Sequence, residues 1–100
     1  MNTIYLQTYS WITDALGIRS NTYHTFEKKV EPGTTLITIL NDLARDYPEF
    51  KKMVYNPETG RLSKQVLLLI NQKLTRLDQV KTAPLKDKDA ISLMPVIFGG

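Results

Sequence analysis

The stretch AISLMPVIFGG, residues 90–100, ends the chain and decides the prediction of its fold. Residues 90–94 are apolar apart from Ser92, which is typical of a buried strand. Pro95 follows, and it lacks the N–H that a sheet ladder requires, so we predict that regular pairing stops there. The remaining residues, 95–100, could extend about 20 Å at roughly 3.3–3.6 Å per residue. The sequence therefore predicts a strand inside the fold and a tail outside it.

Two glycines, Gly99 and Gly100, form the tip of this tail. Because glycine has no Cβ, such a tip can enter a slot too narrow for any other residue. The reactive group that it would present there is the terminal carboxylate. Two other interpretations stay open at this point, since chain ends are often disordered without function and a cloning remnant can add small residues.

The composition bounds the class of protein. A chain of 100 residues with 42% hydrophobic and 23% charged residues is one domain with enough apolar surface for one core. The start of the chain, residues 1–3, lacks the basic residues of a secretory signal, and no apolar run approaches the length of a membrane span. We therefore expect a soluble, cytoplasmic protein without a membrane partner.

Several kinds of reactive site are excluded by the residues that the chain lacks. The sequence contains no cysteine, which rules out disulfides, thiolate metal sites and a cysteine nucleophile. The one histidine, His24, lies in a strand-like run and is expected at the surface or half-buried. No cluster with metal-ligand spacing and no Ser/His/Asp set is evident, so we expect no metal site and favour a stand-alone enzyme least.

The net charge of +3 is unevenly distributed along the chain. Residues 1–50 hold four Lys/Arg and six Asp/Glu, whereas residues 51–100 hold nine and four. A slightly basic, solvated surface explains this asymmetry, and so does a docking surface for an acidic partner. Nucleic acid is not an expected partner, because the basic residues form no dense run and no binding motif.

Two strands are predicted in the first third of the chain. Residues 4–9 alternate in part and are rich in β-branched and aromatic residues. Residues 10–19 form a connection, with Gly17 as its turn point, and residues 20–30 form the second strand of a hairpin. The packing residues of this second strand are expected to be Tyr23, Phe26 and Val30.

A helix is predicted over residues 35–47. Thr34 or Thr35 can cap its first N–H groups, and Pro48 ends it because proline disfavours helical backbone in the preceding residue. Apolar residues recur with helical spacing on one face. They are Leu36, Ile39, Leu40, Leu43, Ala44 and Tyr47. Residues 49–54 are expected to form a further short turn with Phe50 and Met53 facing inward.

The second half of the chain contains the remaining strands. Residues 56–60 form a turn, and the apolar run at residues 65–70 is a buried strand. Asn71 and Gln72 reverse the chain into a short strand at residues 73–74, and a polar stretch leads to a turn at residues 86–89. The economical closure pairs the first and last strands in the centre of the sheet, with the helix across one face. This is an α+β protein with the β-grasp arrangement and a mixed sheet.

This order of elements with a Gly-Gly end resembles the ubiquitin-like sulfur carriers of the MoaD/ThiS family. The archaeal MoaD-like branch and the ubiquitin-related small modifiers are the most similar. Four segments carry the resemblance: LNDLARDYPEF (40–50), LIN (69–71), PLKDKDAI (84–91) and MPVIFGG (94–100). Four positions depart from the family pattern. Gln72 and Lys88 replace customary turn glycines, Val96 replaces a second proline, and Phe98 stands where a small residue is usual.

The resemblance implies a ubiquitin-like β-grasp domain over residues 1–94 and a flexible tail over residues 95–100. It also implies that a ubiquitin-activating-type adenylyltransferase uses ATP to adenylate Gly100, after which a sulfur donor leaves a thiocarboxylate there. This chain has no Gly-rich Lys-Ser/Thr loop for ATP, so we expect no bound cofactor. The tail residues that would enter the partner's active site are Pro95, Val96, Ile97, Phe98 and Gly99. The candidates for partner docking are Leu93 and Met94.

Three functions stay open, and in each the chain is a carrier or binding protein without catalysis of its own. In the first, the thiocarboxylate donates sulfur in molybdenum cofactor biosynthesis, with the chain as small subunit beside the molybdopterin synthase large subunit, or in tRNA thiolation. In the second, Gly100 is joined to lysines of conjugation targets, as in ubiquitin-like modifiers. In the third, the domain is an interaction module with an idle tail.

Overall fold

The computed structural model describes residues 1–18, 23–80 and 82–96. A five-stranded sheet in the order β2-β1-β7-β5-β6 forms the body, and β3 and β4 pair separately. The strands are β1 Asn2–Tyr9, β2 Tyr23–Val30, β3 Tyr55–Asn56, β4 Arg61–Leu62, β5 Val66–Ile70, β6 Lys73–Thr75 and β7 Ala90–Pro95. The helices are α1 Trp11–Ala15, α2 Leu36–Asp46, α3 Pro48–Met53 and α4 Leu77–Val80.

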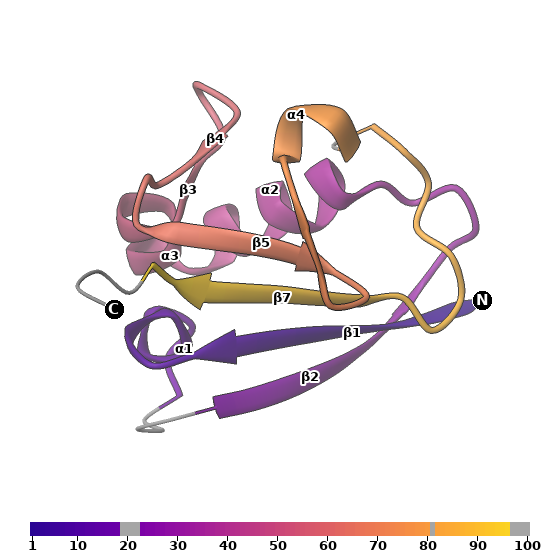
Figure 1. Ribbon diagram of the computed structural model, residues 1–100, viewed down its shortest axis with the longest axis horizontal. Coiled ribbons are helices and arrows are strands. Elements are labelled where there is room, and N and C mark those ends of the chain that lie inside the picture. Colours follow the sequence, from indigo (N-terminus) through magenta and orange to yellow (C-terminus); the bar gives the residue numbers. More distant parts are fainter. Residues whose placement is uncertain (19–22, 81, 97–100) are drawn as a thin grey trace.

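The first and last strands meet in the centre of the sheet, as predicted. β1 and β7 run parallel from the pair Tyr5↔Ala90 to the pair Thr8↔Leu93, and β7 also pairs antiparallel with β5. Helix α2 lies across one face of the sheet, behind it in Figure 1. The two central strands each point apolar residues at this helix, since alternate side chains of a strand share a face. The fold is therefore α+β with a mixed sheet.

Helix α2 follows the predicted pattern closely. The Oγ1 of Thr35 caps its start by accepting the N–H of Thr38 at 3.4 Å. Its buried side chains are Leu36, Ile39, Leu40, Leu43 and Ala44. Tyr47 was wrongly assigned to this face. It is 38% exposed and has extended backbone, because Pro48 begins α3 directly after it.

Truncating the centre of this helix face should destabilise the domain strongly. Leu40 is completely buried, so Leu40→Ala removes a side chain from the core and leaves a cavity. We expect the free energy of unfolding to fall by about 2–5 kcal/mol. Urea unfolding followed by circular dichroism measures this change. Arg45→Ala on the exposed face of α2 is the control and should cost less than about 1 kcal/mol. A small loss in the Leu40 variant would contradict the assigned core.

Four short elements, α1, β3, β4 and α4, were missed in the sequence. The predicted loop after β1 contains α1, which is held to the sheet by a buried 2.8 Å hydrogen bond between the hydroxyls of Thr8 and Thr13. The turn at residues 56–60 is the tip of the hairpin β3–β4, and the polar stretch that follows β6 contains α4. Each of these elements is too short to show a periodic pattern.

Two predicted packing residues face solvent instead. Tyr23 is 46% exposed and lies against the ring of Tyr9, at 5.0 Å between centroids. Met53 at the end of α3 is 43% exposed. In contrast, Phe50 and Val30 are buried as expected, and Phe26 packs against the core. Tyr23 is out of phase with Phe26 in the alternation of β2, so the two cannot share a face.

Pro95 does not end the sheet pairing, contrary to the prediction. It pairs with Val66, and the N–H of Val96 donates to the carbonyl of Gln65 at 2.8 Å. Gln65 and Val96 therefore form a hydrogen-bonded pair of the antiparallel ladder. Hydrogen-bonded and non-hydrogen-bonded pairs alternate, so the neighbouring residues Val66 and Pro95 form a non-hydrogen-bonded pair. The missing N–H of proline would point to the β1 side, where pairing has already ended at Leu93. Proline is therefore accommodated without loss of a ladder bond.

Two turns that lack glycine carry conformational strain. The tight reversal after β5 places Asn71 at φ 51° and Gln72 at φ 69°, and the turn before β7 places Lys88 at φ 70°. Side chains other than glycine are disfavoured in this left-handed region by about 1–2 kcal/mol per residue. Gln72 and Lys88 stand where the family pattern has glycine, and both residues have the left-handed backbone conformation that glycine adopts most easily.

Glycine at either position should stabilise the fold. For Gln72→Gly and Lys88→Gly we expect a gain of about 0.5–1 kcal/mol each, after the greater freedom of glycine in the unfolded chain is subtracted. Lys73→Gly is the control, since Lys73 lies in a strand and should lose about 0.5–1 kcal/mol. Denaturant midpoints of the three variants measure the effects. Destabilisation by all three would show that the turns are not strained.

Candidate functional site

The base of the predicted tail is anchored at the end of β7. Pro95 pairs with β5, and Val96 is half-buried and bonded to Gln65. Ile97, Phe98, Gly99 and Gly100 lie outside the described residues, and their predicted roles stay predictions. A tail that leaves from Val96 starts from a fixed point on the sheet.

The two predicted docking residues lie on opposite faces of β7. Leu93 is completely buried and belongs to the core cluster beneath α2, so its assignment as a docking residue was wrong. Met94 is half-buried and points to the other face, where it lies opposite Leu67 of β5. Neighbours in a strand point to opposite faces, which is why only one of the two can reach a partner.

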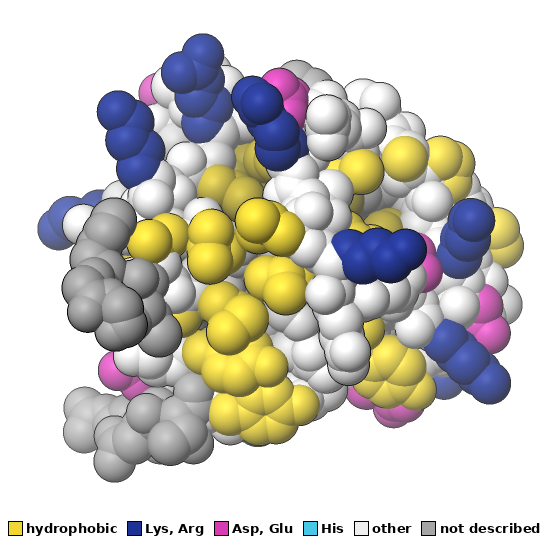
Figure 2. Space-filling view, in the orientation of Figure 1, with side chains coloured by type: hydrophobic (Ala, Val, Ile, Leu, Met, Phe, Trp, Pro, Cys, Tyr) yellow, Lys and Arg dark blue, Asp and Glu magenta, His cyan; other side chains and the backbone are white. Residues whose placement is uncertain are grey.

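The sheet surface opposite α2 carries a group of apolar side chains. We call it the outer sheet face and define it by Tyr9, Tyr23, Leu67, Leu69, Leu74 and Met94. Leu74 is 71% exposed and lies opposite Leu69, and Figure 2 shows apolar side chains gathered across the front of the sheet. A contiguous exposed apolar surface of this kind marks an interaction site.

The sequence contained a signal for this face that we did not use. The run Val66–Ile70 is apolar at every position, whereas a strand with one solvated face alternates apolar and polar residues. An uninterrupted run in a sheet with only one helix-covered face therefore leaves apolar residues outside. Two polar residues, Ser92 and Gln7, lie opposite each other at the centre of the face, and the hydroxyl of Ser92 donates to Oε1 of Gln7 at 2.8 Å.

Basic residues gather around a groove between α3 and the β3–β4 hairpin. Four cations line it, namely Lys51, Lys52, Arg61 and Lys64. Among the described residues, Glu58 is the one carboxylate that forms an ion pair with these cations, and its Oε1 lies 3.7 Å from Lys51 Nζ. An adjoining hollow is lined by Trp11, Met53 and Gln65, the residue that holds Val96. The base of the tail therefore lies between an apolar sheet face and a basic groove.

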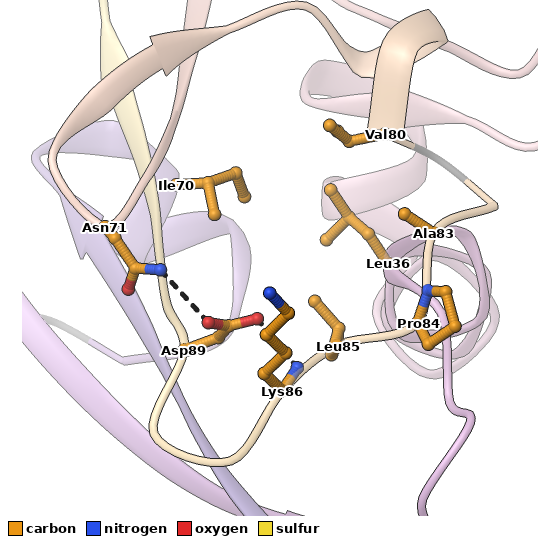
Figure 3. Close-up of a pocket in the computed structure, with 9 residues that line it drawn as sticks. All are labelled: Leu36, Ile70, Asn71, Val80, Ala83, Pro84, Leu85, Lys86 and Asp89. Carbon is orange, nitrogen blue, oxygen red and sulfur yellow. Dashed lines mark hydrogen bonds between the residues drawn. The ribbon is translucent and has the colours of Figure 1, made fainter.

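A small pocket lies at the other end of β7 (Figure 3). It has a volume of about 220 Å³ and is lined mainly by apolar side chains, including Leu36 and Ile70. Its polar groups already bond one another: Asn71 Nδ2 donates to Asp89 Oδ1 at 3.0 Å, and the N–H of Lys86 donates to Asp89 Oδ2 at 2.8 Å. These bonds tie the 86–89 turn to β5, so they position the start of β7.

Two titratable groups of the described residues have a shifted pKa. Burial raises the pKa of Tyr55 above its usual value, and the hydrogen bond that Arg45 donates to Asp46 raises the pKa of Arg45. Both groups therefore stay protonated at neutral pH. Within residues 1–18, 23–80 and 82–96, no three His, Cys, Asp or Glu side chains come together as a metal site. In the same ranges, no helix is long and apolar enough to cross a membrane.

Comparisons with known proteins agree with this architecture. The sequence profile of the ThiS family matches residues 18–100. No curated protein matches the sequence.

Solved structures share the fold. SAMP1 from Haloferax volcanii is similar with a TM-score of 0.70 at 18% identity, over 99% of this chain and 100% of that one. Urm1 from Trypanosoma brucei has a TM-score of 0.69 at 21% identity, over 99% and 96%. Molybdopterin converting factor subunit 1 from Pyrococcus furiosus has a TM-score of 0.67 at 14% identity, over 97% and 100%. These similarities confirm the β-grasp fold.

Proposed function

Because this chain belongs to the ThiS family of ubiquitin-like sulfur carriers, we propose that it carries sulfur as a thiocarboxylate on Gly100. The observation that carries the proposal is the family match, which extends to Gly100. The anchored base at Val96 supports it, because a tail that delivers a reactive end into a partner needs a fixed origin. In this proposal the chain has no catalytic machinery of its own and acts in the cytoplasm.

The proposed chemistry begins with activation of the carboxylate. A carboxylate oxygen of Gly100 attacks the α-phosphorus of ATP on a ubiquitin-activating-type enzyme, and pyrophosphate leaves. The terminal sulfur of a donor persulfide then bonds to the carbonyl carbon, and AMP leaves. A thiol finally breaks the S–S bond, which leaves the thiocarboxylate on this chain and a disulfide on the donor side. ATP is a substrate of the partner enzyme, and the chain itself binds no cofactor.

We propose the molybdopterin precursor as the acceptor of the sulfur, with this chain as the small subunit of molybdopterin synthase. The similarity to the Pyrococcus furiosus molybdopterin converting factor subunit supports this choice. The absence of cysteine is compatible with it, since the carried sulfur would be the only sulfur nucleophile on the chain. The synthase large subunit would then receive the tail.

The second candidate is a protein modifier joined through Gly100 to lysines of target proteins, or a sulfur donor for tRNA thiolation. The similarity to SAMP1, a small archaeal modifier protein, and to Urm1 favours it. Activation of Gly100 is common to both candidates. The two candidates differ only in the molecule that reacts with the activated Gly100. In the first candidate it is the molybdopterin precursor, and in the second it is a lysine side chain or tRNA.

Intact-mass measurement tests the proposal. The chain is incubated with its activating enzyme, ATP and sulfide, and we expect the mass to rise by the difference between sulfur and oxygen, on the C-terminal peptide. Addition of the molybdopterin synthase large subunit and precursor should then return the original mass. Lysine peptides that carry a Gly-Gly remnant in cells would favour the modifier instead. If no activating enzyme from the same cells changes the mass, both candidates are wrong, and the remaining hypothesis is an interaction module with an idle tail.

A further inference from the structure

Strand β2 is an unprotected edge of the sheet. It has 8 residues and pairs with β1 along its whole length, and Figure 1 shows no element on its other side. The opposite edge, β6, has only 3 residues. Long edge strands are templates for pairing with another chain unless something covers or interrupts them. β2 contains neither proline nor glycine, so the stretch from Thr25 to Lys29 can accept a partner strand.

The hydrogen-bond pattern shows which residues of β2 face outward. In β1, the N–H of Tyr5 donates to Asp89 at 2.9 Å and the carbonyl of Thr3 accepts from Lys88 at 2.6 Å, so these residues face the β7 side. The alternate residues of β1, Ile4 and Leu6, must therefore face β2. Through the register, their partners Lys28 and Phe26 bond to β1. The intervening residues Thr25, Glu27 and Lys29 direct N–H and C=O groups away from the sheet.

These outward groups have no partner in the part of the chain that the structure describes. No backbone bond joins Thr25, Glu27 or Lys29 to another element. The side chain of Glu27 makes no ion pair or hydrogen bond there either, whereas Lys29 Nζ donates to Thr3 Oγ1 at 2.6 Å. Alternating free donors and acceptors in one line are complementary to the backbone of an extended peptide.

An apolar cavity lies directly beside this edge. It has a volume of about 110 Å³ between β2 and α2 and is lined by Phe26, Leu6, Leu16, Leu43 and Tyr47. The charged residues that line it are Lys28, Asp42 and Asp46, and Arg45 bridges both carboxylates at 3.1 Å. The charges therefore balance, and the cavity is suited to one aliphatic side chain. The edge and the cavity are independent features that both fit the same ligand.

We propose that β2 binds an extended peptide of another protein as an added strand of the sheet. Its backbone bonds to Thr25, Glu27 and Lys29, and one aliphatic side chain enters the cavity beneath Phe26. A lysine or arginine of the peptide lies opposite Glu27 on the outer side, because opposite charges in facing positions stabilise a strand pair. This surface differs from the base of the tail, so the chain could hold such a partner while Gly100 is activated.

A second copy of this chain fits the edge less well. In an antiparallel pair of β2 strands, Glu27 of one copy forms an ion pair with Lys29 of the other copy when these two residues lie directly opposite each other. The same register places Lys28 opposite Lys28 of the copy, and facing like charges destabilise a pair. We therefore assign the edge to a heterologous peptide.

Hydrogen exchange observed by NMR tests the geometry directly. The probe is a synthetic peptide of 8 residues, the length of β2, in which threonine alternates with valine and one central threonine is replaced by lysine. In the free protein, the amides of Phe26 and Lys28 should exchange slowly and those of Thr25, Glu27 and Lys29 quickly. Addition of the peptide should slow the second group by tenfold or more at saturation. Binding without this alternating protection would overturn the proposal.

Three substitutions of the exposed residue Glu27 separate the contributions. Glu27→Pro removes an outward N–H without touching the bonds to β1 and should weaken peptide binding by about tenfold or more. Glu27→Ala keeps the N–H and is the matched control, with a loss of at most about fivefold. Glu27→Lys should prefer a peptide that carries glutamate in place of its lysine. Equal affinity of all variants, or concentration-dependent dimers that the peptide does not dissociate, would contradict the proposed site. Sulfur loading of Gly100 should be unchanged in all three, so a failure here leaves the carrier function untouched.

Discussion

Deletion of Gly100 should abolish conversion of the chain to a thiocarboxylate. Removal of one residue shortens the reach of the tail by about 3.5 Å, and misplacement by about 1 Å can cost about 10²-fold in rate. We therefore expect conversion at least about 10²-fold slower than in the wild type. The rate of mass gain with the activating enzyme, ATP and sulfide measures this effect. The β-grasp domain should keep its unfolding midpoint, because the change lies beyond β7.

Two controls accompany the deletion. Gly99→Val should also fail, since its branched side chain would have to enter the slot meant for glycine, although the tail keeps its length. Lys88→Gly changes a turn at the opposite end of β7 and should convert as readily as the wild type. If the Gly100 deletion were converted at the rate of the wild type, the carrier proposal would be wrong.

We predict that the activating enzyme docks on the outer sheet face, so a charge placed there should impair its recognition of the chain. Leu74 is the most exposed apolar residue of that face, and Leu74→Asp places a carboxylate where an apolar partner surface would bury it. Loss of a buried apolar contact of this kind costs about 2 kcal/mol, so we expect the KM for the carrier to rise about thirtyfold. The chemistry at Gly100 is untouched, and kcat should therefore change little. Steady-state rates of pyrophosphate release measure both constants.

The neighbouring residue offers a matched control for this prediction. Lys73 lies beside Leu74 in the same edge strand and points to the other face of the sheet. Lys73→Asp adds a carboxylate at nearly the same place in the sequence, and we expect a less than threefold change in KM, within the range of exposed charges. If the two variants raised KM equally, net charge rather than the outer sheet face would govern recognition.

The main elements could be predicted because their patterns are long. Helix α2 shows helical spacing over three turns, with Thr35 and Pro48 as physical signals for its start and end. The central position of β1 and β7 followed from their apolar composition and from the rule that sheets bury such strands. In contrast, α1 and α4 have 5 and 4 residues, and their positions depend on tertiary contacts such as the bond between Thr8 and Thr13.

The site could be predicted only in part. The Gly-Gly end stood out in the sequence as a tip without side chains, its chemical role came from the resemblance, and that role stays a prediction. The exclusion of Leu93 from the surface and the continued pairing of Pro95 depend on strand phase and register, which composition does not reveal. The outer sheet face and the edge of β2 arise from strands that are far apart in sequence, and the uninterrupted apolar run of β5 is the one local pattern that we identified for the face.

The pairing of β1 with β7 has a consequence for the order in which the domain is made. During synthesis β1 emerges from the ribosome well before β7, its parallel neighbour. Contacts between distant parts of a chain form slowly, because a long loop must close before they contribute stability. Until β7 inserts, both β1 and β5 lack their shared neighbour. A chain that stops before β7 would therefore expose two apolar strands to proteases and chaperones.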